Sequence, residues 1–345
     1  ESSLADIEEW FEKGIEESSW RLDYHGFDKE NERLREALTT VGNGYVGTRG
    51  AYVGVGIEDD VHYPGTYLAG LFNNRGTEVE GTTIYNNDFV NCPNWLTVDC
   101  IVDDGEPLAP LVHQPVRWHQ WLDMRDATTH HVADFRDEKG RETRVETVRL
   151  VSMEEPHLAA LQYTVTPLNY SGRLTIRSSL DGNVINYGVE RYRPLESRHL
   201  EKGKSSVEDG DIKLETRTNE SKVSVTMRAH NEVYLDERRI EDEREISRES
   251  SAIAENFVLD AQEGRQYKLE KIVWIATDRP WPIEDAIMPK LSMLRFHEVL
   301  ANHRQKWREI WNVADMRVQG DRFVQRTSRL HVYHLLSTAS IHNEK

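Results

Sequence analysis

The chain has 345 residues, enough for one large domain or two of ordinary size, with a sizeable buried core. Its formal net charge is −17 at pH 7, and 30% of its residues are charged, which is typical of a globular protein with a heavily solvated surface. Such a surface repels polyanions, so we expect the protein to bind neither nucleic acid nor an anionic membrane.

The two cysteines, Cys92 and Cys100, are too far apart for a CxxC site and have no histidine pair at metal spacing nearby. A disulfide between them is an alternative, but two thiols in a chain of this size favour a reducing, cytoplasmic location. No apolar run approaches the roughly 20 residues that span a bilayer. The acidic start at Glu1 is unlike a secretory signal.

The first forty residues show helical periodicity. Apolar residues recur there at three- and four-residue spacing, at Leu4, Ile7, Trp10, Phe11 and Ile15. A second short helix is predicted over residues 28–38, with Asp28 as its N-cap.

From about residue 42 to residue 278 the apolar residues alternate instead, which is typical of half-buried strands. Representative sets are Leu96, Val98, Cys100 and Val102; Ala159, Leu161, Tyr163 and Val165; Leu174, Ile176 and Leu180; Val223, Val225, Met227 and Ala229; Tyr267, Leu269 and Val273. Turn-forming clusters separate them, for example at residues 103–105, 138–140 and 209–211. Many antiparallel strands over more than two hundred residues predict two large packed sheets.

Helical periodicity returns over residues 283–311, with Pro289 predicted to break or restart the helix. Asp321 is a good N-cap for a last helix that begins at Arg322. The apolar residues of that helix cover most of its circumference, so it is expected to be buried by neighbours beyond Lys345. A chain ending at Lys345 should therefore expose an apolar patch at Phe323, Leu330, Tyr333 and Leu336.

Two segments, EALTTVGNGYVGTRG at residues 36–50 and YPGTYLAGLFN at residues 63–73, resemble the N-terminal signature and a second block of glycoside hydrolase family 65. This family includes maltose, trehalose and kojibiose phosphorylases and some hydrolases. Residues 91–96, NCPNWL, resemble a third block. His303 to Trp307, Trp311, Gly320-Asp321 and Gln325 are similar to the linker that enters the family's barrel, and residues 335–345 to the first barrel helix and its exit.

The resemblance implies a mainly β fold: a large antiparallel β-supersandwich, related to galactose mutarotase, then linker helices and the first helix of an (α/α)6 barrel. The corresponding division is 1–280 for the sandwich with its leading helices, 281–318 for the linker and 319–345 for the barrel helix. The resemblance further implies a homodimer that acts on a disaccharide by way of the barrel.

In the family, a barrel glutamic acid protonates the glycosidic oxygen and inorganic phosphate attacks the anomeric carbon with inversion, or water attacks in the hydrolases. The resemblance implies no metal and no organic cofactor, with phosphate only as co-substrate. The glutamate is expected beyond Lys345, so no catalytic residue is assigned and this chain alone is expected to be inactive.

Three alternatives stay open at this point. The first is a trehalase-type α-glucoside hydrolase of the same family. The second is a freestanding carbohydrate-binding or structural β-sandwich, which has no reason to end in a helix that is apolar nearly all round. The third is a mutarotase-like epimerase, which needs a general acid and base inside the sandwich, and no such pair stands out.

The candidate substrate-binding residues are Phe72, Asn74, Asn94 and Trp95, chosen from their place in the family pattern. Aromatic rings can stack on the apolar faces of sugars, and amides can hydrogen-bond hydroxyl groups. The competing interpretation for Trp95, and for Trp118 and Trp121, is packing in the core.

Other patterns are interpreted structurally. The glycines at 42, 44, 47 and 50 lack the Gly-Lys-Ser/Thr of a phosphate-binding loop and predict a tight turn, with Arg49 as its lock. The spacing of His113, His119, His130 and His131 suits no standard metal site, so none is predicted. The acidic run 236–249 predicts a solvated face.

Overall fold

The computed structural model describes residues 16–56, 60–187, 197–240, 244–279, 288–318 and 320–340. The helix predicted from Leu4 to Ile15 lies outside these residues, as does the start of the helix predicted from residue 283.

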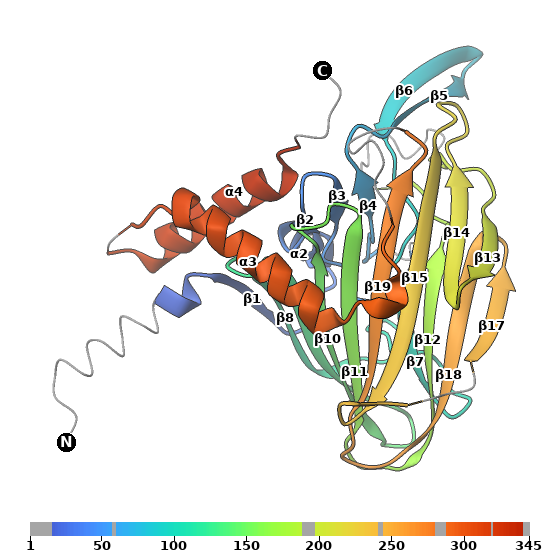
Figure 1. The fold of residues 1–345 in the computed structure, drawn as a ribbon, viewed down its shortest axis with the longest axis vertical. Coiled ribbons are helices and arrows are strands. Elements are labelled where there is room, and N and C mark those ends of the chain that lie inside the picture. The colour runs from blue at the N-terminus through green and yellow to red at the C-terminus, as the bar shows by residue number, and fades with distance from the viewer. Residues whose placement is uncertain are drawn as a thin grey trace.

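The largest element of the fold is a ten-stranded antiparallel sheet with the order β1-β8-β9-β10-β11-β19-β15-β14-β13, in which β16 also pairs with β15 (Figure 1). Its strands are β1 (Arg21–His25), β8 (Pro115–Asp123), β9 (Thr128–Arg136), β10 (Glu142–Val151), β11 (Leu158–Pro167), β13 (Lys204–Glu208), β14 (Asp211–Arg217), β15 (Ser224–Leu235), β16 (Arg238–Arg239) and β19 (Tyr267–Thr277).

A four-stranded antiparallel sheet, β17-β18-β12-β7, packs face to face against one half of the large sheet. Its strands are β7 (Val98–Val102), β12 (Gly172–Asp181), β17 (Arg244–Glu249) and β18 (Ala252–Ala261). Two small sheets lie at one end of this sandwich (Figure 1). They are β2 (Val41–Gly42), β3 (Val46–Thr48) and β4 (Thr66–Leu68), and the hairpin of β5 (Phe72–Val79) and β6 (Thr82–Phe89).

The core lies between the two large sheets and confirms the predicted mainly β, antiparallel fold. Residues that alternate along the chain fill it: Val98, Cys100 and Val102 are buried, whereas the residues between them are only half-buried. Cys92 and Cys100 are both buried free thiols, so the alternative of a disulfide is wrong.

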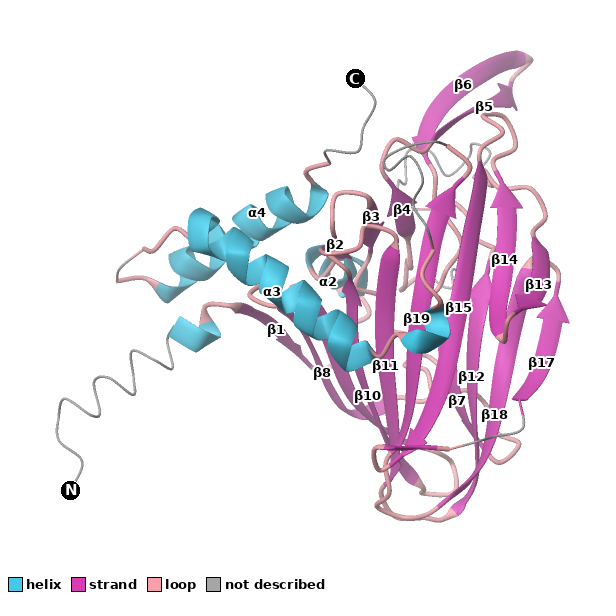
Figure 2. Cartoon of the chain, in the orientation of Figure 1, coloured by secondary structure: helices cyan, strands magenta, loops and turns pink. Residues whose placement is uncertain are grey.

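The outer face of the large sheet is buried as well where helices cover it. Leu158 and Ala160 of β11 and Trp274 of β19 pack against Phe296 and Val299 of helix α3 (Phe296–Ala314), beside the 3-10 turn η2 (Leu291–Met293). Strands β11 and β19 are therefore buried on both faces. Figure 2 shows that helix α4 (Arg322–Thr338) lies on the same flank of the sandwich as α3.

The N-terminal prediction was partly wrong. Residues 21–25 form strand β1, which pairs with β8 from Arg21↔Asp123 to His25↔His119. A pattern of five residues is too short to distinguish a strand from a helix, and the partner strand lies about a hundred residues away in sequence. Helix α2 (Glu32–Leu38) begins after Asn31, and Asp28 instead accepts hydrogen bonds from Glu30 N (3.2 Å) and Asn31 Nδ2 (2.8 Å).

The predicted N-cap of the last helix was right, and so was the predicted break of the preceding helix near Pro289. Asp321 caps α4 by accepting from the backbone of Phe323 and Val324, as predicted. The regular part of α3 starts only at Phe296, after Pro289 and the 3-10 turn.

The predicted apolar patch on α4 is not continuous. Phe323 is 66% exposed, but Tyr333 is fully buried and Leu330 and Leu336 pack partly against the core. The side of α4 that faces the protein is a narrow stripe of Gln325, Arg329, Tyr333 and Ser337 at four-residue spacing.

Candidate functional site

A cavity of about 850 Å³ opens where the small sheet β2-β3-β4, the base of the β5–β6 hairpin and the end of α4 meet. Its lining combines backbone-exposing glycines, aromatic rings, hydroxyl groups and two guanidinium groups. The lining residues are Ala37, Thr40, Gly44, Tyr45, Val46, Gly47, Arg49, Tyr67, Ala69, Gly70, Leu71, Phe72, Phe89, Thr277, Arg279, Ser337, Thr338 and Ser340.

One wall of the cavity is the glycine-rich turn that precedes β3. Asn43 organises it, since its Oδ1 accepts from Tyr45 N (3.0 Å) and Val46 N (2.8 Å) while its Nδ2 donates to Ser152 O (2.7 Å). Gly44 has φ +83° and donates its N–H to Ser337 O (2.9 Å). The prediction of a tight turn is confirmed, and Gly44 allows the close approach of α4 to this turn.

Arg49 stands between this wall and α2. Its Nε donates to Tyr63 O (2.7 Å), its Nη2 donates to Arg33 O (2.8 Å), and Nη2 lies 3.6 Å from Glu36 Oε2. The guanidinium also lies over the Tyr63 ring. Arg49 therefore joins α2 to the loop before β4, and it carries positive charge to the edge of the cavity.

A cluster of three aromatic rings forms another part of the lining. Phe89 stacks on Tyr67 with ring centroids 5.1 Å apart and meets Phe72 at 5.2 Å. Phe72 is 44% exposed and Phe89 40% exposed, so both present apolar surface to solvent. Tyr67 OH donates to Tyr63 OH (3.2 Å), and burial raises the pKa of Tyr67, which keeps that phenol neutral.

The four predicted substrate-binding residues do not form one site. Phe72 lines the cavity. Asn74 is exposed, two residues further along β5. Sugar binding by these two residues stays a prediction.

Asn94 and Trp95 lie in the core instead. Trp95 is fully buried and its Nε1 donates to Thr48 Oγ1 (3.1 Å), while Asn94 Oδ1 accepts from Leu96 N (3.0 Å). These contacts favour the packing interpretation for both residues, and the local Asx turn at Asn94 explains the amide there.

Sequence reasoning missed several residues of the cavity. Arg279 follows β19 and donates from Nη1 to Gly70 O (2.9 Å), so it reaches the cavity from a segment more than 200 residues away. Tyr45 and Thr338 belong to segments that were singled out, but neither was chosen. Burial raises the pKa of Tyr45 to about 12. Only the fold brings these groups together.

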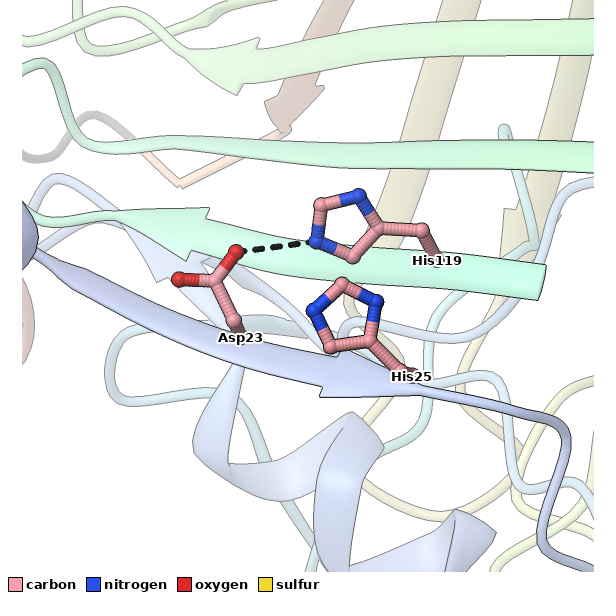
Figure 3. Close-up of side chains that lie close together, drawn as sticks. All are labelled: Asp23, His25 and His119. Atoms are coloured by element: carbon pink, nitrogen blue, oxygen red, sulfur yellow. Dashed lines mark hydrogen bonds and ion pairs between the residues drawn. The ribbon is translucent and has the colours of Figure 1, made fainter.

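The histidines of the large sheet are separated by its two faces. His130 and His131 are neighbours on β9 and point to opposite faces, and burial lowers the pKa of His130 to about 3. A different set does converge: Asp23, His25 and His119 place one potential ligand atom each within 4.8 Å of one another (Figure 3).

The comparisons with known proteins agree with this architecture. The family described as "Glycosyl hydrolase family 65, N-terminal domain" matches residues 22–310. The chain belongs to this family. The predicted family resemblance is thereby confirmed.

Among curated relatives, an uncharacterised glycosyl hydrolase of Mycobacterium tuberculosis (strain H37Rv) is 34% identical over 94% of this chain and 25% of its own length. Trehalose 6-phosphate phosphorylase of Lactococcus lactis is 28% identical over 94% of this chain and 41% of its own. Kojibiose phosphorylase of Halothermothrix orenii is 25% identical over 96% of this chain and 42% of its own. The chain thus spans less than half the length of these relatives.

A solved structure from the human microbiome, described as a candidate kojibiose phosphorylase, matches with a TM-score of 0.78 and 15% identity over 93% of this chain and 42% of its own. This likeness supports the fold alone. Among the helices that the structure describes, none is long and apolar enough to cross a membrane.

Proposed function

We propose that this chain is the N-terminal, non-catalytic part of an inverting disaccharide phosphorylase of family 65. In this proposal the parent enzyme cleaves an α-glucoside such as maltose, trehalose or kojibiose with inorganic phosphate, giving β-glucose 1-phosphate and glucose. A catalytic glutamic acid outside this chain protonates the glycosidic oxygen while phosphate attacks the opposite face of the sugar.

The observation that carries the proposal is the cavity at the end of the sandwich. Its volume of about 850 Å³ suits a small organic ligand. Phe72 and Phe89 offer apolar faces for a sugar ring, and Thr277, Thr338 and Ser340 offer hydroxyl groups. The proposed role of this chain is to form one wall of the sugar site.

A hydrolase of the same family is the second candidate. It is favoured by the two Mycobacterium tuberculosis relatives named glycosyl hydrolase, which are 34% identical to this chain. In the hydrolase, water attacks in place of phosphate and a second carboxylate serves as the base, and the wall formed by this chain serves both candidates.

The test is an assay of the full product of the coding sequence. Maltose, trehalose, kojibiose and trehalose 6-phosphate are each offered with and without inorganic phosphate, and the sugar products are identified. Phosphate-dependent release of β-glucose 1-phosphate supports the phosphorylase, and phosphate-independent release of glucose transfers the assignment to the hydrolase. Absence of cleavage under both conditions contradicts both candidates.

Four further parts of the proposal concern the state of the protein. We propose a homodimer, a cytoplasmic location and catalysis without metal or organic cofactor, and we propose that this chain alone is inactive. Sedimentation of the full product tests the dimer. The same disaccharide assay on residues 1–345 tests the inactivity, which cleavage by that chain alone contradicts.

A further inference from the structure

Two adjacent strands at the edge of the large sheet bring two imidazoles and one carboxylate to one face. Asp23 and His25 are two residues apart on β1 and therefore share a face. His119 of β8 lies directly opposite His25 in the antiparallel register. The three side chains thus form the corners of one small patch, although His119 is 94 residues away from His25 in sequence.

The distances suit a small cation. His119 Nε2 lies 2.9 Å from Asp23 Oδ1, and the three potential ligand atoms are all within 4.8 Å of one another. With bonds of about 2.0–2.2 Å, the ligand atoms of a tetrahedral zinc ion are separated by about 3.3 Å. The Asp23–His119 pair needs to open only by about 0.4 Å to admit such an ion.

Each histidine ring has one nitrogen close to the Asp23 carboxylate. The two rings stack with centroids 4.2 Å apart and 14° between their planes. Figure 3 shows one nitrogen of each ring on the side of the Asp23 carboxylate. Because the rings are parallel, one must rotate before both lone pairs converge, and His25 is exposed at the end of its strand and has room to do so.

Neighbouring side chains hold the His119 ring in place. The Trp121 ring stacks on His119 as well, with ring centroids 4.4 Å apart. Arg21, on the same face of the sheet, lies over the Trp121 ring and 3.6 Å from Asp123 Oδ2, so its charge is directed to another carboxylate. The His119 ring therefore contacts two other rings, which pre-position one ligand of the site.

We propose that Asp23, His25 and His119 bind one zinc ion, with the fourth position open to water. Two imidazole nitrogens and one carboxylate oxygen are a ligand set that zinc uses with an open position. Strand β1 has a single neighbour, β8, in the sheet order, so the ion would fasten this edge strand to the sandwich. No metal site was predicted from the sequence. That prediction considered only the spacing of residues along the chain, which does not show that His25 and His119 lie opposite each other on neighbouring strands.

The experiment is a zinc titration of the purified, chelator-treated protein by calorimetry, with Co²⁺ absorption as a spectroscopic probe of the ligands. The expected result is one zinc ion per chain and a higher midpoint of thermal unfolding. His25→Ala and His119→Ala should each weaken zinc binding by at least about 100-fold. His297→Ala, which removes an exposed histidine of α3, is the matched control and should bind zinc as the parent does.

The rival outcome is a histidine–carboxylate ion pair that takes up no cation. It is established if the parent protein binds no zinc, or if His25→Ala and His119→Ala bind it as tightly as His297→Ala does, and either result overturns the proposal. If His119→Ala fails to fold, His25→Ala carries the test, because the His25 side chain is exposed and its loss leaves the sheet contacts of β8 in place.

Discussion

At the scale of single residues, buried polar groups tie the separate parts of the protein together. Arg329 of α4 donates from Nε to Asp315 Oδ1 (2.9 Å) and lies over the Trp20 ring at 3.7 Å. His303 of α3 lies 2.9 Å from the backbone oxygen of Asp126, and burial lowers its pKa to about 4. Such groups are hard to predict from sequence, because a lone arginine or histidine in a helix is ordinarily exposed.

Gly44 gives a residue-scale prediction about the wall of the cavity. A Cβ at Gly44 would lie 2.5 Å from Ala339 O, and φ there is +83°. Gly140 has a similar φ of +79° but open space around it. Gly140→Ala should therefore lower the free energy of unfolding by about 1 kcal/mol, and Gly44→Ala by about 2–4 kcal/mol.

Urea unfolding of the two variants measures this difference. Equal losses of stability in the two variants would show that the end of α4 moves away from the added methyl group without cost, and that its contact with the turn at Gly44 does not contribute to stability.

Lys271 gives a second prediction, on pH dependence. The side chain is fully buried in the sandwich, where its Nζ donates to Ser179 O (2.6 Å), and burial lowers its pKa to about 7 from 10.5. Between these two values the unfolded chain binds the extra proton, so this group makes the folded state gain stability as pH rises from about 7 to about 10.

The stability difference between Lys271→Met and the parent isolates this effect from other titrations. The free energy of unfolding of Lys271→Met minus that of the parent should fall by a few kcal/mol as the pH rises from about 7 to about 10. Lys204→Met, at an exposed position of β13, is the control and should show no such trend. A difference that does not change with pH between 7 and 10 would mean that Lys271 keeps its ordinary pKa.

At the scale of elements, the pattern predicted the strands well where burial alternates, as in β7 and β12. It also predicted β11 and β19, but it did not show that the second face of these two strands is buried beneath helices. The prediction missed strand β1, because its five residues are too few to show a pattern and its pairing with β8 cannot be read from the sequence. The spacing in α4 gave the helix and its cap, but the stripe that faces the sandwich is largely polar.

That stripe makes a prediction about α4. Tyr333 is fully buried, packs against Trp307 with ring centroids 5.4 Å apart, and donates its hydroxyl to Thr40 O (2.9 Å). Tyr333→Ala should cost about 3–5 kcal/mol and release α4 from the sandwich. Leu335→Ala, at a position 69% exposed on the same helix, should change stability by less than about 0.5 kcal/mol.

Limited proteolysis between α3 and α4 reports the release directly. Faster cleavage in Tyr333→Ala than in Leu335→Ala is expected. Equal cleavage rates would mean that α4 is held by contacts other than the polar stripe.

At the scale of the whole molecule, the sandwich, the glycine-rich turn and α4 together enclose the cavity. Sequence reasoning found the family and placed Phe72 in this region, because the motifs are local. It could not predict that Arg279 lines the cavity, or that Trp95 is buried whereas Phe72 is exposed. Both facts depend on contacts between distant segments of the chain. The cross-strand cluster of Asp23, His25 and His119 was missed for the same reason.

The central claim, that the end cavity is part of a sugar site, is tested most directly by kinetics of the full gene product with Phe72→Ala. Loss of the exposed ring face should lower kcat/KM for the disaccharide by about 10-fold, equivalent to about 1.4 kcal/mol of transition-state binding. Tyr85→Ala, which removes a 69% exposed ring on β6 of the same hairpin, should leave kcat/KM within about twofold of the parent. Equal kcat/KM for Phe72→Ala and Tyr85→Ala would contradict the claim.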